Sequence, residues 1–192
     1  MTARSRSSRS TRYSWVRSEA VRSARGDDRA ASYRRPGSGV DCGDPLGGCG
    51  VLDQAAGERP ELATAQIVDN RGGIGRTLLH VVTDWPGYYP NGPDTVALLL
   101  AAGADPDANT GGGRPETPLH WAASSDDLDV AEALIDGGAT DDAGGSIGTP
   151  LENAVGYGCW HVARLLYAQG ARADKLWVAA GLGLLPLVRE HV

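Results

Sequence analysis

The residue order first suggests thiol chemistry, because Cys159 and His161 lie two positions apart. A nucleophilic thiol needs an imidazole base within hydrogen-bond distance and a third group that orients the base. Residues one or two positions apart do not face each other on a helix. This pair also falls at a turn between two apolar helical patterns. We therefore expect structural turn residues here rather than a catalytic pair.

A second group of residues has the spacing of a calcium-binding loop. Asp105, Asp107, Asn109 and Glu116 would occupy positions 1, 3, 5 and 12 of such a loop. Position 6, which needs Gly for a sharp turn, is Thr110. The flanking segments do not have the pattern of the two helices that flank an EF-hand calcium loop. We therefore expect an ordinary turn and no bound metal.

Other sites of known chemistry find little support. Cys42 and Cys49 have no nearby Cys or His that would complete a zinc site. The chain contains no phosphate-binding GxxxxGK[ST] loop, no GxSxG nucleophile turn and no HExxH zinc motif. The sequence therefore predicts a protein that is not an enzyme and that carries no cofactor.

The secondary-structure elements that position these residues can be predicted from a sequence motif, here called the phrase, that occurs twice. Thr117–Ala123 reads TPLHWAA, and Thr149–Val155 reads TPLENAV. Each is followed by Gly-Ala, at Gly138 and at Gly170, 21 residues after its Thr. Pro118 can occupy the first turn of a helix, and apolar residues then recur at helical spacing. A unit of about 33 residues predicts a stack of helix pairs.

Weaker copies flank these two units. Arg76–Val82 resembles the phrase, and its partner helix is predicted at Thr95–Ala102, ending at Gly103. Leu176–Ala180 begins a last, shortened unit whose turn is Gly183. The predicted repeats span about 76–109, 116–143, 148–171 and 174–192, after a degenerate start at 49–75.

The repeated phrase resembles the ankyrin repeat, whose pattern is Thr-Pro-Leu-His-x-Ala-Ala, a short turn, a second helix and Gly-Ala-Asp. The match covers about residues 76–190. The unit RTLLHVVTDWP is also similar to uncharacterised bacterial ankyrin proteins. The resemblance implies an all-α solenoid of antiparallel helix pairs, with short hairpin loops between repeats and a truncated last repeat.

The resemblance also assigns structural roles to individual residues. His80 and His120 stand at the family's structural His position, so both are expected to form hydrogen bonds within the stack. Glu152 replaces this His in the third unit. We expect the family's Thr–His hydrogen bond to be lost there and the stack to be softer near Glu152.

Charge divides the chain into two parts. Residues 1–40 carry ten Arg and three acidic residues, a net charge of +7, whereas residues 41–192 carry a net charge of −13. Residues 1–48 have no sustained apolar periodicity, which predicts a disordered basic segment before a domain at 49–192.

No signal peptide or membrane-spanning stretch is recognisable. One Lys beside seventeen Arg is typical of a GC-rich genome, so we expect a bacterial cytoplasmic protein.

Candidate binding residues follow from the implied solenoid, because its usual binding side consists of loop tips and first-helix faces. Their acidity suggests a basic protein partner, although a solvated acidic surface explains it almost as well. The candidates are Asp105, Asp107, Asn109, Arg114, Glu116, Trp121, Ser124, Ser125, Asp141 and Asp142.

An aromatic insert in the first unit, residues 84–93, suggests a second surface at the helix ends opposite the hairpins. Trp85, Tyr88 and Tyr89 can act as binding anchors, because Trp and Tyr provide large contact areas at a small entropy cost. Alternatively, the three rings fold back over the helix ends as local core. The sequence leaves both interpretations open.

The sequence therefore favours a monomeric, non-catalytic protein-binding module that acts as an adaptor or inhibitor. The alternative is a nucleic-acid- or membrane-associated factor that acts through the Arg-rich residues 1–35. An unrecognised enzyme is the third hypothesis. Neither the partner nor the pathway follows from the sequence.

Overall fold

The computed structural model describes residues 59–68, 75–111 and 115–192. The predicted disordered segment 1–48, the Cys42/Cys49 pair and the candidate Arg114 lie outside these residues. The described elements are η1 (Pro60–Thr64), β1 (Gln66–Ile67), β2 (Arg76–Thr77), α3 (Leu78–Thr83), α4 (Gly92–Ala101), α5 (Pro118–Ser125), α6 (Leu128–Asp136), α7 (Pro150–Tyr157), α8 (Trp160–Gln169), α9 (Leu176–Gly181) and α10 (Leu185–His191).

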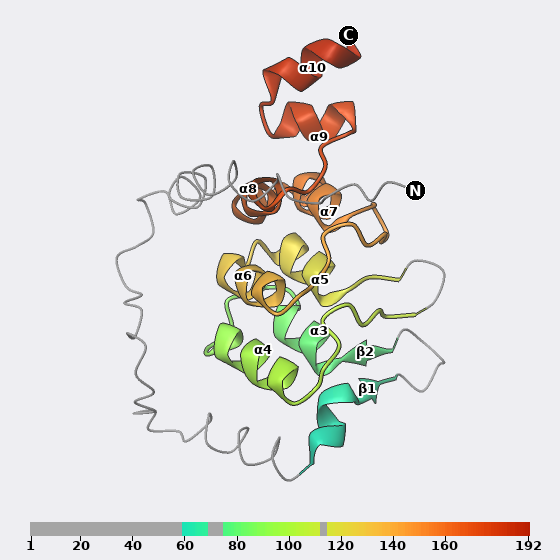
Figure 1. The fold of residues 1–192 in the computed structure, drawn as a ribbon, viewed down its shortest axis with the longest axis vertical. Coiled ribbons are helices and arrows are strands. Elements are labelled where there is room, and N and C mark those ends of the chain that lie inside the picture. Colours follow the sequence, from blue (N-terminus) through green and yellow to red (C-terminus); the bar gives the residue numbers. More distant parts are fainter. Residues whose placement is uncertain (1–58, 69–74, 112–114) are drawn as a thin grey trace, which may run out of the picture.

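The helices form a stack of pairs, in which each first helix packs on its own second helix and on the next first helix (Figure 1). The first helices α3, α5, α7 and α9 contact one another in order, and α4, α6 and α8 form a parallel second row. The predicted all-α stack of helix pairs is confirmed. In the described part of the chain, no helix is both long and apolar enough to cross a bilayer.

The first helices α3, α5 and α7 begin in the same way, whereas α9 follows Lys175 without a side-chain cap. Thr77, Thr117 and Thr149 are in extended backbone conformation, and each forms a capping box with the residue three positions later. This arrangement satisfies amide groups that lack a partner at a helix start. Second helices end at Gly138 and Gly170, whose φ angles of +97° and +109° are strained for other residues.

The core is built from Leu and Ala at equivalent positions of successive units. Leu79, Leu119 and Leu151 are fully buried, as are Ala122 and Ala154. Each buried Leu contributes about 2 kcal/mol, and the small Ala side chains let neighbouring helices approach closely. A single helix pair could not bury this apolar surface alone, so the layers stabilise one another.

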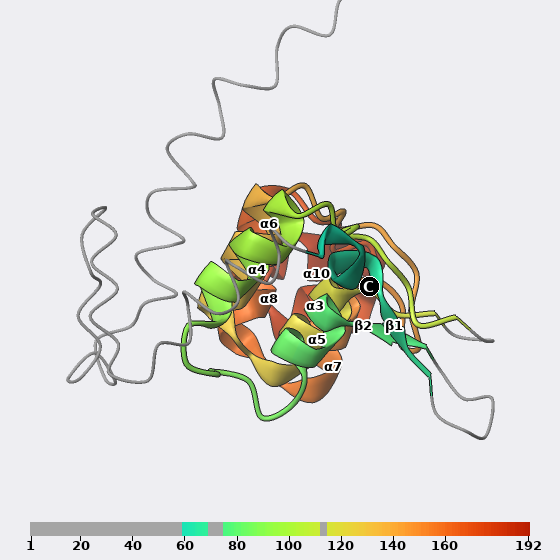
Figure 2. The same ribbon diagram turned by 90° about the horizontal axis from the view of Figure 1, so that it is seen from below.

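The connections lie on two opposite edges of the stack (Figure 2). The long loops between units project at one edge, and the described part of this edge has a single two-stranded sheet, in which Gln66 pairs with Thr77 and Ile67 with Arg76. The α3–α4 loop, residues 84–91, lies at the other edge. We call the first the loop edge and the second the turn edge.

Two details differ from the sequence-based expectation. Helix α4 begins at Gly92 rather than at Thr95, because Asn91 takes up a left-handed conformation and Pro93 is accepted in the first turn. The loop after α6, residues 137–149, contains no strand. A backbone hydrogen bond from Gly145 N to Gly148 O closes this loop instead.

Candidate protein-binding surface

Successive loops are tied together along the loop edge. Asp107 Oδ1 accepts a hydrogen bond from the backbone N of Thr140 in the next loop, at 2.8 Å. Glu116 Oε1 accepts from the backbone N of Ser146 at 3.3 Å and from the Ser146 hydroxyl. Because these bonds cross from one unit to the next, the loop tips hold fixed positions relative to each other.

The predicted acidic side chains differ in exposure along this edge. Asp105, Asn109 and Asp142 are exposed, whereas Asp107, Glu116 and Asp141 are half-buried. Asp107 and Glu116 accept hydrogen bonds from the neighbouring loop. The edge therefore combines anchoring carboxylates with others that point to solvent.

The first-helix face is more enclosed than expected. Trp121 is half-buried; its indole N–H donates to Glu116 Oε2 at 3.1 Å, and its ring packs edge-on against His80 with centroids 5.1 Å apart. The Ser124 hydroxyl donates to the carbonyl of Trp121. The expectation that Ser125 is exposed is wrong, because its side chain is buried and donates to Thr83 O in the preceding unit.

The calcium-like spacing builds a turn. Asp105 Oδ1 accepts from the backbone N of Asp107, and Asn109 Oδ1 accepts from the backbone N of Gly111. These contacts use carboxylate and amide oxygens as caps for local backbone groups. Among residues 59–68, 75–111 and 115–192, no group of His, Cys, Asp and Glu is suited to hold a metal ion.

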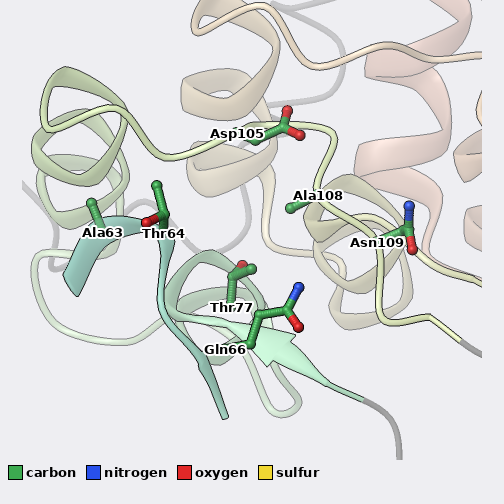
Figure 3. Close-up of a pocket in the computed structure, with 7 residues that line it drawn as sticks. All are labelled: Ala63, Thr64, Gln66, Thr77, Asp105, Ala108 and Asn109. Carbon is green, nitrogen blue, oxygen red and sulfur yellow. The ribbon is translucent and has the colours of Figure 1, made fainter. Parts of the chain in front are cut away.

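A cavity of about 280 Å³ lies at the first end of the loop edge, between β1 and the loop after α4 (Figure 3). It contains two of the predicted residues, Asp105 and Asn109, and brings Gln66 and Thr64 to them. The sequence did not indicate Gln66 or Thr64, since residues 60–67 lack the repeated phrase. One carboxylate, two amides and hydroxyl groups can hydrogen-bond a polypeptide, but they include no nucleophile paired with a base.

The aromatic insert packs on the next unit through its backbone and the Tyr88 hydroxyl, whereas its rings do not form a buried core. Its backbone packs on the next unit, because Tyr88 N donates to Asp127 Oδ2 at 2.5 Å and the Tyr88 hydroxyl donates to Asp126 O. The side chains nevertheless face solvent: Trp85 is 76% exposed, Tyr88 61% and Tyr89 39%. The loop is held in place while its rings remain accessible.

The thiol and imidazole of the third turn do not contact each other. Cys159 Sγ donates to Ser124 O at 3.2 Å, whereas His161 Nδ1 lies 2.6 Å from Asp126 Oδ2. Burial raises the pKa of the Cys159 thiol, which disfavours the reactive thiolate. Cys159 lies in the turn before α8, as expected, whereas His161 lies in the first turn of α8, and both contact the preceding unit.

The histidines of the repeated phrase form a ladder through the stack. The ring nitrogen Nδ1 of His120 accepts from Thr117 N at 3.1 Å, and Nε2 lies 3.0 Å from Gly148 O in the next loop. His80 repeats this arrangement with Thr77 N and Glu116 O. Each imidazole thus caps its own helix and holds the following loop.

The third unit lacks the Thr–His bond, as expected, and Glu152 forms other contacts at this position. Glu152 Oε2 accepts from Thr149 N at 3.2 Å, so a carboxylate completes the capping box that an imidazole completes elsewhere. The same oxygen lies 2.9 Å from Lys175 Nζ in the last unit. The Thr–His bond is absent, but a carboxylate cap and an ion pair take its place.

Comparison with known proteins agrees with this geometry. A family model described as ankyrin repeats in three copies matches residues 79–176, just over half of the chain. A search among curated proteins found no relative of this chain. Ankyrin repeats generally mediate protein–protein interaction and are typically non-catalytic. The match, the capped Thr-Pro-Leu-His phrase and the stacked helix pairs together show that the chain belongs to the ankyrin repeat family.

Proposed function

We propose that this protein is a non-catalytic adaptor or inhibitor that binds a basic protein partner along its loop edge. One observation carries the proposal: acidic loops from successive units are joined by hydrogen bonds through Asp107 and Glu116, with exposed carboxylates beside them. A surface that is ordered before binding loses little conformational entropy in the complex.

The chemistry of this edge favours a cationic partner. Asp105 and Asp142 are exposed, and residues 41–192 carry a net charge of −13. Complementary charge speeds association and selects against acidic partners. The cavity beside Asp105 adds the amides of Gln66 and Asn109, which can hydrogen-bond a bound main chain.

An affinity experiment with the full chain tests the proposal. The tagged protein is incubated with lysate of its source organism, and the recovered proteins are quantified for wild type and for Asp105→Asn/Asp142→Asn. We expect a basic protein whose recovery falls roughly tenfold in the double variant, because two charge contacts are lost. Recovery should also decrease with ionic strength.

A matched control removes two exposed acids away from the loop tips. Glu61→Gln/Glu190→Gln lowers the net negative charge by the same amount, and both side chains are exposed near opposite ends of the stack. This variant should retain the partner at wild-type levels. Equal losses in both double variants would mean that overall charge, not the loop edge, governs binding and would contradict the proposal.

A further inference from the structure

The turn edge carries exposed aromatic rings on a backbone that is fixed to the next unit. Trp85 and Tyr88 are 76% and 61% exposed, and they lie three positions apart in one loop. Gly87 between them packs so closely that an added Cβ would lie 3.1 Å from Ser125 Cβ and 3.3 Å from Asp127 Cβ. The backbone that carries the rings is therefore fixed.

The surroundings of these rings are acidic. Partial burial and the neighbouring carboxylates of Asp126, Asp127 and Asp129 together raise the pKa of Tyr88 to about 12. Asp94 and Asp129 are exposed in the first turns of α4 and α6. This negative environment disfavours an anion and favours a cation at the aromatic faces.

Two basic side chains already lie beside carboxylates of the α3–α4 loop and of the turn after α5. Arg76 pairs with Asp84 at 3.3 Å, and His161 pairs with Asp126 at 2.6 Å. The exposed Asp94 and Asp129 add negative charge beyond these pairs. A guanidinium group placed over an aromatic ring here would be attracted both by the face of the ring and by the nearby carboxylates.

The chain itself contains a segment of matching chemistry. Residues 1–35 hold ten Arg, no Lys and three acidic residues. Residues 36–58 connect this segment to Arg59, and 23 residues can span up to about 75 Å. That reach exceeds the roughly 40 Å occupied by four stacked helix layers. A tethered segment also has an effective concentration in the millimolar range, which favours it over a separate basic ligand.

We propose that the Arg-rich residues 1–35 bind within the same chain to the turn edge, with guanidinium groups over Trp85 and Tyr88. The contact shields these rings and leaves the loop edge accessible to a partner. The proposal does not depend on the function proposed for the loop edge, and its test uses a different surface and readout.

Photo-crosslinking in the full chain tests this contact. Tyr89→p-benzoylphenylalanine places a photoreactive group beside Trp85 and Tyr88 and leaves both rings intact. Tyr167→p-benzoylphenylalanine is the control. Tyr167 is also 39% exposed, but it lies near the C-terminal end of α8, away from the turn edge. Mass spectrometry then measures crosslinks to residues 1–35. We expect at least tenfold more of them from position 89 than from position 167.

Two further changes separate a specific contact from chance proximity. Replacing all ten Arg of residues 1–35 by Gln leaves the helical stack untouched and should lower the crosslink yield from position 89 roughly fivefold or more. About 1 M NaCl should have a similar effect, since it shortens the screening length to about 3 Å. In low salt, Trp85→Ala/Tyr88→Ala should also lower the crosslink yield from position 89.

The outcome that overturns the proposal is equally specific. Equal yields from positions 89 and 167, or a yield that is unchanged in the Arg→Gln chain, would exclude recognition at the turn edge. Mixing isotopically heavy and light chains identifies the source of each crosslink. Crosslinks that join heavy to light chains would assign the contact to a second copy and would overturn the intrachain proposal.

Discussion

His120 shows how one buried side chain joins two units. It is fully buried, caps its own helix through Thr117 N and lies 3.0 Å from Gly148 O in the following loop. We predict that His120→Ala lowers the free energy of unfolding by about 3 kcal/mol, because it leaves a cavity and two unpaired buried groups. Urea denaturation measures this loss. His161→Ala, whose imidazole is half exposed, should cost less than about 1 kcal/mol, and equal losses would contradict the role assigned to His120.

The same histidines make stability depend on pH. Burial lowers the pKa of His80 and of His120 below the ordinary value of 6.5, so the unfolded chain binds protons that the folded chain does not. Stability is therefore fully present above about pH 6.5 and decreases as the pH falls below it. His191 has a raised pKa, caused by its backbone hydrogen bonds to Leu187 and Asp174, and acts in the opposite direction from an exposed position.

We therefore predict that unfolding free energy falls between pH 7.5 and 5.5 in the wild type and falls less in His80→Gln/His120→Gln. The double variant starts from lower stability, so the comparison concerns the slope with pH and not the absolute value. Urea titrations at four pH values provide both slopes. Parallel slopes would show that other groups dominate the acid sensitivity.

At the scale of elements, Asp127 links the α3–α4 loop to the start of α6. Its carboxylate accepts from Tyr88 N at 2.5 Å and from Val130 N at 3.3 Å, and its side chain is buried. Burial raises the pKa of this carboxyl. We predict that Asp127→Ala destabilises the fold by about 1–3 kcal/mol, because a helix cap and a loop anchor are lost together.

Two variants make this prediction specific. Asp127→Asn keeps an oxygen acceptor and should recover part of the loss, whereas Asp129→Ala removes an exposed neighbour and should change stability by less than about 0.5 kcal/mol. Thermal denaturation of the three variants compares them directly. Similar melting temperatures for Asp127→Ala and Asp129→Ala would show that the loop does not need this anchor.

At the scale of the whole molecule, stability should vary along the stack. Helices α5, α6 and α7 have neighbours on both sides, whereas α10 has no buried residue and α9 contributes only Val178 and Ala179 to the buried set. In a repeat array each layer is stabilised by its nearest neighbours. We predict that amide hydrogens of α9 and α10 exchange at least roughly tenfold faster than those of α5 and α7.

Hydrogen exchange with mass spectrometry measures this gradient peptide by peptide. Val178→Ala should accelerate exchange in the last pair and leave α5 unchanged, because the effect of the cavity decays across layers. Uniform protection from α3 to α10, or equal acceleration everywhere, would indicate a single cooperative unit instead.

Particular residues show which features could be predicted from the sequence. The Thr-Pro starts at Thr117 and Thr149 and the Gly stops at Gly138 and Gly170 depend on local backbone chemistry, so the pattern indicated them directly. The burial of Ser125 did not follow from the pattern, since its hydroxyl meets Thr83 O, 42 positions away in the chain. The ion pair of Glu152 likewise did not follow from the pattern, because Lys175 lies in the following unit.

The amino-acid order by itself therefore determined the repeat, the helix boundaries of the clearest units and the Leu and Ala core, because these depend on contacts within about one unit. Only the tertiary structure decided which acidic side chains anchor neighbouring loops and which stay exposed. It also decided that Tyr88 is held by Asp126 and Asp127 while the rings of Trp85 and Tyr88 face solvent. These outcomes depend on the packing of one layer on the next. Contacts between layers cannot be read from the spacing of residues along the chain.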